Sequence, residues 1–199
     1  MSRKFPLKRF ALPLMAMVFL SSCTTLQDDR VSVDYYNING NTTAALDQAI
    51  RRNGPRLNGG RHAVAVARIK MVPNITFTPS GTDRCNITAV KVAVDARITL
   101  PRWVGRAKAN AKLARAWDSI DRYTRAHEAV HVDIAFDYAR RMERELLLMP
   151  NLGTCEALKL RSRVVIDKML REHNAAQIAF DEREMERFRN FARQKSDKS

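Results

Sequence analysis

The sequence has little glycine and proline, and it has no long apolar run after its first segment. Only 7 Gly and 7 Pro occur among 199 residues, which excludes a collagen-like or low-complexity chain. No run beyond residue 22 reaches the roughly 18 apolar residues that a membrane-spanning helix needs. With 45% apolar and 28% charged residues, the remainder predicts one soluble globular domain, because two smaller domains would each have a poor core.

Acidic residues are scarce relative to basic ones. The chain has 35 Lys and Arg against 21 Asp and Glu, a net charge of +14. Residues 1–22 hold four basic residues and no acidic one, so the rest of the chain has a net charge of +10. This charge favours anionic surroundings such as lipid or polysaccharide. We do not expect nucleic acid as a partner, because the basic residues are scattered and no aromatic platform accompanies them.

Residues 1–22 have the features of a bacterial lipoprotein signal peptide. A basic start precedes an apolar stretch that is too short to span a bilayer. The run from Leu20 to Cys23 resembles a lipobox, which implies that Cys23 is acylated and that residues 23–30 are a lipidated tether. Thr24 follows, rather than the Asp that resembles an inner-membrane retention signal, so we expect attachment to the periplasmic face of the outer membrane. An ordinary cleaved signal or a buried N-terminal helix is the alternative.

Cys85 and Cys155 remain once Cys23 is set aside. An even pair in an exported protein predicts one disulfide, because the compartment is oxidising. The bond would close a loop of about 70 residues and stabilise the fold by roughly 4 kcal/mol. Neither residue has a second Cys two to four positions away, which disfavours a cysteine zinc site. Two buried free thiols are the alternative.

Residues 31–188 are predicted to form one α+β domain in which strands come first and helices follow. The segment 85–100 alternates most clearly between apolar and polar residues, which indicates a half-buried antiparallel strand. We therefore expect a small antiparallel sheet. The other predicted strands are 31–37, 63–71 and 75–78, and a short helix capped by Thr42 or Thr43 is predicted over 44–52.

The pattern changes period after Pro101. Apolar residues recur at spacings of three and four, which predicts a long helix ending near Leu148. Residues 150–153 break this helix, and a second helix is predicted from about Cys155. The two form a hairpin. The charged residues 189–199 are expected to form a solvated tail.

His127-Glu128-Ala129-Val130-His131 is an HExxH motif within the first of these helices. Two His four residues apart project from one helix face, so both imidazoles can reach one Zn²⁺ at about 2.0 to 2.1 Å. Glu128 can reach a water activated by that zinc without binding the metal, and we predict that it is the general base. Composition alone would produce the motif only about 0.003 times per chain. Two core histidines beside a surface Glu are the alternative.

The hairpin predicts a third zinc ligand. If the turn is centred near residue 151 or 152, residue 172 lies opposite His131 and residue 176 lies opposite His127. His173 falls between these levels and on the apolar stripe of its helix, so we predict that His173 binds the zinc. The alternative is that His173 is a solvent or core residue that binds no metal. Asp181 and Glu186, one to three turns further along the helix, are the fallback ligands.

Several short motifs surround HExxH in a fixed order. They are Tyr35-Tyr36 through Gly40, Leu46, Gly54-Pro55, Cys85, Leu100-Pro101-Arg102-Trp103, Cys155, and His173 through Phe180-Asp181. Over about residues 31–186 the chain thus resembles a family of secreted bacterial proteins of unknown function that are described as predicted zinc-dependent proteases. The resemblance implies a metallopeptidase with His127 and His131 as ligands and Glu128 as the general base.

The chain departs from the family pattern after Asp181. In that pattern the matching Asp is followed by a Thr and a His-Gly pair, whereas this chain has no His there and Glu186 stands in its place. Asp181 and Glu186 are therefore the alternative third ligands. The sequence predicts an extracytoplasmic zinc metallopeptidase that acts on a peptide or protein substrate. A non-catalytic, metal-binding envelope lipoprotein is the alternative function.

Overall fold

A computed structural model describes residues 29–57, 60–151 and 153–196, and it describes side chains up to residue 190. The predicted signal peptide, Cys23 and most of the tether lie outside the described residues. No helix within these ranges combines the length and the hydropathy needed to cross a membrane.

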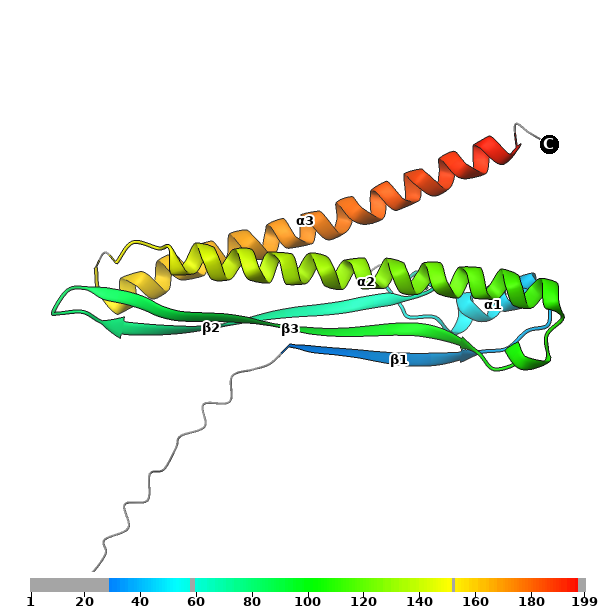
Figure 1. Cartoon of the computed structure of the whole chain (residues 1–199), viewed down its shortest axis with the longest axis horizontal. Coiled ribbons are helices and arrows are strands. Elements are labelled where there is room, and N and C mark those ends of the chain that lie inside the picture. The colour runs from blue at the N-terminus through cyan, green and yellow to red at the C-terminus, as the bar shows by residue number, and fades with distance from the viewer. Residues whose placement is uncertain (1–28, 58–59, 152, 197–199) are drawn as a thin grey trace, which may run out of the picture.

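Within the described residues, three strands, one short helix and two long helices form the domain, which is of the predicted α+β class (Figure 1). The elements in chain order are β1 (Arg30–Ile38), α1 (Thr43–Asn53), β2 (Val66–Pro79), β3 (Cys85–Trp103), a short 3-10 turn (Arg106–Lys108), α2 (Ala111–Leu147) and α3 (Cys155–Ser196). The charged C-terminal segment continues α3 to Ser196, where a solvated tail was expected.

The sheet has the order β1-β3-β2 and is mixed, where an antiparallel sheet was expected. β2 and β3 are consecutive antiparallel strands, whereas β1 lies on the far side of β3 and runs parallel to it. The extended pieces expected at 63–71 and 75–78 are one strand, β2, that continues through Pro73. Proline is tolerated there because β2 is an edge strand and its outer side needs no ladder partner.

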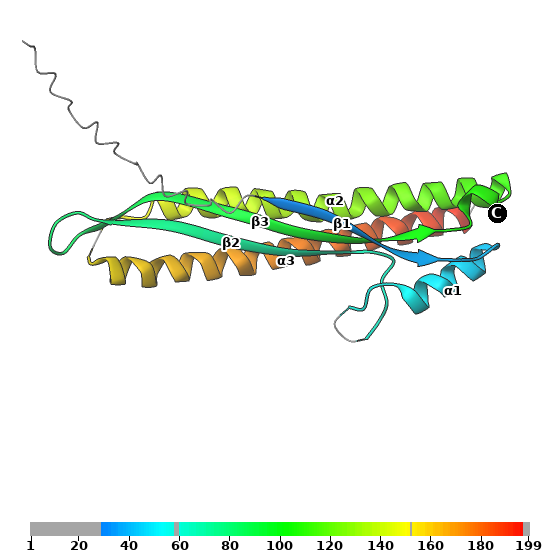
Figure 2. The ribbon, with the colours of Figure 1, turned by 90° about the horizontal axis from the view of Figure 1, so that it is seen from below.

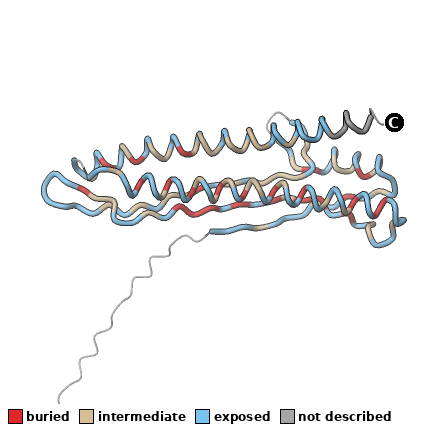
Figure 3. Tube along the Cα trace, turned by 45° about the horizontal axis from the view of Figure 1, so that its top comes forward, coloured by how far each residue is buried: buried red, intermediate tan, exposed pale blue. Residues whose placement is uncertain are grey.

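The core lies between β3 and α2, which runs along one face of the sheet (Figures 1 and 2). The alternation predicted for residues 85–100 is present from Val92 to Leu100, where every second residue is buried and belongs to the core shared with α2. Buried residues are red in Figure 3. The main buried residues are Val92, Val94, Ala96, Ile98 and Leu100 from β3, and Val132, Ala135, Ala139, Met142 and Leu146 from α2. This packing holds the middle of α2, where HExxH lies, against the sheet.

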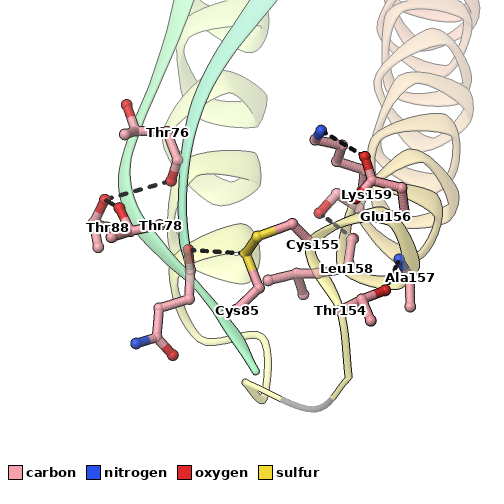
Figure 4. The surroundings of a disulfide bond; sticks show 12 residues. Thr76, Thr78, Cys85, Thr88, Thr154, Cys155, Glu156, Ala157, Leu158 and Lys159 are labelled. Carbon is pink, nitrogen blue, oxygen red and sulfur yellow. Dashed lines mark hydrogen bonds and ion pairs between the residues drawn. A yellow bond between two sulfur atoms is a disulfide. The ribbon is translucent and has the colours of Figure 1, made fainter. Parts of the chain in front are cut away.

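The disulfide expected between Cys85 and Cys155 is present (Figure 4). Cys85 is the first residue of β3 and is fully buried, and Cys155 is the first residue of α3. The bond therefore connects the tip of the sheet to the start of the second long helix. The preceding connection turns at Gly153, whose φ of 80° is readily adopted by glycine.

Removal of this disulfide should destabilise the domain. The two cysteines are 70 residues apart, and a loop of that length predicts a loss of about 4 kcal/mol in the free energy of unfolding. Urea unfolding of a Cys85→Ser, Cys155→Ser double variant, compared with the oxidised parent, measures the difference. Two thiols that react with a label in the unfolded, unreduced parent would show that the bond does not form.

Candidate metal centre

The HExxH motif lies near the centre of α2, a helix of 37 residues. Asn110 caps this helix by accepting a hydrogen bond of 2.9 Å from the backbone N–H of Leu113. His127 and His131 project from the same face one turn apart, and their Nε2 atoms are 3.2 Å from one another. Both side chains are mostly buried, with 21% and 13% of their surfaces exposed.

Asp181 of α3 completes a cluster of three donor atoms. Its Oδ1 lies 3.2 Å from Nε2 of His127 and 3.0 Å from Nε2 of His131. Donors bound to zinc at about 2.0 to 2.1 Å in a tetrahedron are about 3.3 Å apart. The three atoms therefore have nearly the separations that one shared metal ion requires, and these three residues can together hold a metal.

His173, the predicted third ligand, is not part of this cluster. The expected hairpin placed residues 176 and 172 opposite His127 and His131, whereas Asp181 and Gln177 lie there. The difference is five residues, somewhat more than one helical turn. α3 begins beyond the end of α2 (Figures 1 and 2), so an extra turn of α3 precedes the level of the histidines.

Gln177 occupies the space between His131 and His173. Its Nε2 is 2.9 Å from the backbone carbonyl of His131 and 2.8 Å from Nε2 of His173, and its Oε1 is 2.5 Å from Nδ1 of His131. The amide group of Gln177 thus engages Nε2 of His173, the atom that would otherwise be free to bind a metal. Sequence reasoning did not find Gln177.

The aromatic ring of Phe180 packs against both motif histidines, at 4.8 Å from the ring centre of His127 and 5.0 Å from that of His131. This contact restricts both imidazoles. Nδ1 of His127 is buried and has no hydrogen-bond partner within the described ranges. The orientation of His127 thus depends on packing rather than on a hydrogen bond to that nitrogen.

Glu128 lies beside the cluster but is not part of it. Its side chain is turned toward the sheet, where the backbone N–H of Ala67 in β2 donates a hydrogen bond to the carboxylate. Only 5% of the residue is exposed, and this burial raises the pKa of Glu128. A buried carboxylate with a raised pKa is a stronger base than an exposed one, which suits a group that accepts a proton.

A cleft of about 690 Å³ opens onto these residues between β2, α2 and α3. Glu128 and the three clustered residues line it, together with His173, Asn174 and Gln177, and its other wall is apolar. The apolar residues are Leu57, Ala63, Ala65, Val66, Ala67, Ile69 and Ile178. The side chain of Asp181 is 52% exposed, so the cluster is reachable from solvent.

Glu186, the other alternative third ligand, does not belong to the cluster. Glu186 is exposed, and five residues of helix turn it about 140° away from Asp181. Glu184 instead lies on the side of the cluster and accepts a hydrogen bond of 3.0 Å from the hydroxyl of Tyr123. Hydrogen bonds from Arg187 and Tyr123 lower the pKa of Glu184. One face of α3 carries His173, Gln177, Asp181 and Glu184, at spacings of four, four and three residues. This spacing was the sequence signal that these residues share the face turned toward the cluster.

These features define an α+β domain in which α2, α3 and the edge strand β2 surround a candidate metal-binding cluster. Residues 33–188 match the family described as bacterial protein of unknown function (DUF922), and the chain belongs to that family. No curated protein and no solved structure matches the chain.

Proposed function

We propose that the protein is a zinc-dependent metallopeptidase of the bacterial cell envelope. The observation that carries the proposal is the arrangement of three donor atoms from His127, His131 and Asp181, 3.0 to 3.2 Å apart, beside a buried carboxylate that is not one of them. Three protein ligands are the usual number in catalytic zinc sites, where the fourth position is left for water or substrate.

The chemistry of the donor set fits zinc. Two imidazoles and one carboxylate serve Zn²⁺ in hydrolases and Fe²⁺ in oxygenases. Glu128 favours hydrolysis, because an iron oxygenase has no use for an adjacent base. A bound zinc ion would supply a Lewis acid for the scissile carbonyl and for the water that attacks it.

Glu128 has the properties of the proton carrier in this reaction. It follows the first ligand directly in the chain, it is buried, and the N–H of Ala67 holds its carboxylate in place. It would accept a proton from the attacking water and then deliver it to the nitrogen of the leaving amine. The cleft beside it would admit a peptide or protein segment, and its apolar wall would contact apolar side chains of that segment.

We place the enzyme outside the cytoplasm. The signal-like start of the chain and the lipobox-like run ending at Cys23 support an N-terminal lipid anchor. The disulfide between Cys85 and Cys155 is consistent with an oxidising compartment. A lipid at Cys23 would keep the domain close to its membrane, and the excess of basic over acidic residues would favour contact with anionic lipid.

The decisive experiment measures zinc content and peptide hydrolysis on the same purified protein, made from Thr24 onward. We expect about one zinc per chain and cleavage of denatured or envelope proteins that stops after chelation and returns with added zinc. Zinc without hydrolysis of any substrate would favour the non-catalytic envelope lipoprotein. Absence of bound zinc under all conditions would contradict both functions.

A further inference from the structure

We propose that Gln177 is a positioning residue that fixes the proton of His131 on Nδ1 and so turns the lone pair of Nε2 toward the metal centre. The inference rests on the proposed metal site for its functional consequence. Its structural basis is a set of three hydrogen bonds made by one side-chain amide on α3.

The orientation of this amide is determined by the backbone. One end of the Gln177 side chain lies 2.9 Å from the carbonyl oxygen of His131, which can only accept a hydrogen bond. That end must therefore be the NH₂ group. The carbonyl end, Oε1, is then the atom that lies 2.5 Å from Nδ1 of His131.

The tautomers of two histidines follow from this orientation. Oε1 has no hydrogen to donate, so Nδ1 of His131 must carry the proton. In the neutral ring Nε2 then has a free lone pair, and this atom is the one that lies 3.0 Å from Oδ1 of Asp181. The same NH₂ group lies 2.8 Å from Nε2 of His173, which must accept and therefore carries its proton on Nδ1.

His173 thus has a role other than that of a ligand. It accepts a hydrogen bond from Gln177 only as long as its ring is neutral, and burial lowers its pKa, which favours the neutral form. The ring also packs edge-on against Tyr138 at 5.8 Å between centres. His173 therefore gives the NH₂ group of Gln177 a second acceptor beside the carbonyl oxygen of His131.

The two motif histidines differ in the hydrogen-bond partner of Nδ1. Nδ1 of His131 has an acceptor on α3, whereas Nδ1 of His127 has none within the described part of the chain. Outer hydrogen bonds to metal-ligating histidines are worth roughly 10- to 100-fold in metal affinity. We expect that Gln177 makes this contribution through His131.

Two substitutions and one control test the role of Gln177. Gln177→Leu removes every hydrogen bond of the amide, whereas Gln177→Glu keeps an oxygen that can accept from Nδ1 of His131. Asn174→Leu is the matched control, because Asn174 is an exposed amide that lines the same cleft on the same helix. Zinc affinity is measured by competition with a chromophoric chelator, and nitrogen-15 NMR of the metal-free proteins reports which nitrogen of His131 carries the proton.

In the metal-free parent we expect the proton of His131 on Nδ1, and in Gln177→Leu a mixture of both tautomers. Zinc affinity should fall roughly 10- to 100-fold in Gln177→Leu and stay near that of the parent in Gln177→Glu and Asn174→Leu. A parent with the proton on Nε2, or an unchanged affinity in Gln177→Leu, would overturn the proposal. Equal losses in Gln177→Leu and Gln177→Glu would also overturn it. A parent that binds no zinc contradicts the proposed function, while the NMR result still decides the role of Gln177.

Discussion

Replacing Asp181 with alanine is expected to lower zinc affinity by more than the roughly 100-fold that loss of an outer hydrogen bond can cost. The substitution removes one of three donor atoms and the only carboxylate among them. Two neutral imidazoles would then face the cation without a compensating charge. Competition with a chelator of known zinc affinity measures the loss, and melting temperature in the presence of chelator checks that the fold persists.

Two further variants make this result specific. Glu186→Ala removes an exposed carboxylate five residues along the same helix and should leave zinc affinity unchanged. His173→Ala should cost less than Asp181→Ala, because His173 contacts Gln177 rather than the cluster. If instead His173→Ala abolished binding while Asp181→Ala kept it, His173 would be the ligand and α3 would pack against α2 in a different register.

The strands and helices were largely predictable, because each has a strong local pattern. β3 alternates from Val92 to Leu100 and α2 repeats at three and four residues, and both patterns depend only on which face is buried. The partner of β1 was not predictable in this way. Its parallel pairing with β3 depends on the path of the chain through α1, and no residue of β1 itself records that path.

The candidate site was predictable within one helix and not across two. His127, Glu128 and His131 are positioned by α2 alone, so their spacing was sufficient to identify them. Asp181 is positioned by the register between α2 and α3, and that register depends on how far α3 extends before it meets α2. An error of five residues in the hairpin was enough to exchange Asp181 for His173.

Gln177 was missed for a chemical reason. A search for ligands considers imidazoles, thiolates and carboxylates, and an amide is none of these. Its importance depends on three hydrogen-bond distances. One joins Gln177 to His173, four residues away, and the other two join it to His131, which is distant in sequence. A helical stripe that contains a His, a Gln and two carboxylates at spacings of four, four and three is a pattern that would point to such a site.

Glu128→Gln is expected to lower peptide hydrolysis by roughly 10² to 10⁴, the loss typical of a missing general base, while zinc remains bound. The amide cannot accept a proton from water at neutral pH, but its oxygen can still accept the hydrogen bond from Ala67. Because burial raises the pKa of Glu128, a neutral side chain at this position should leave the melting temperature unchanged or slightly higher. Turnover, zinc content and melting temperature are measured on the same preparation.

The control for this variant is Glu143→Gln on the same helix. Glu143 also accepts a hydrogen bond from a backbone N–H of the sheet, that of Val92 at 2.8 Å, but it lies outside the cleft. If the contact between α2 and the sheet were what sustains activity, both variants should lose it, whereas a general base predicts loss in Glu128→Gln alone. Release of zinc from Glu128→Gln would show that Glu128 supports the metal, and the proton-transfer role would then be wrong. Retained zinc with unchanged turnover would assign the base to another group.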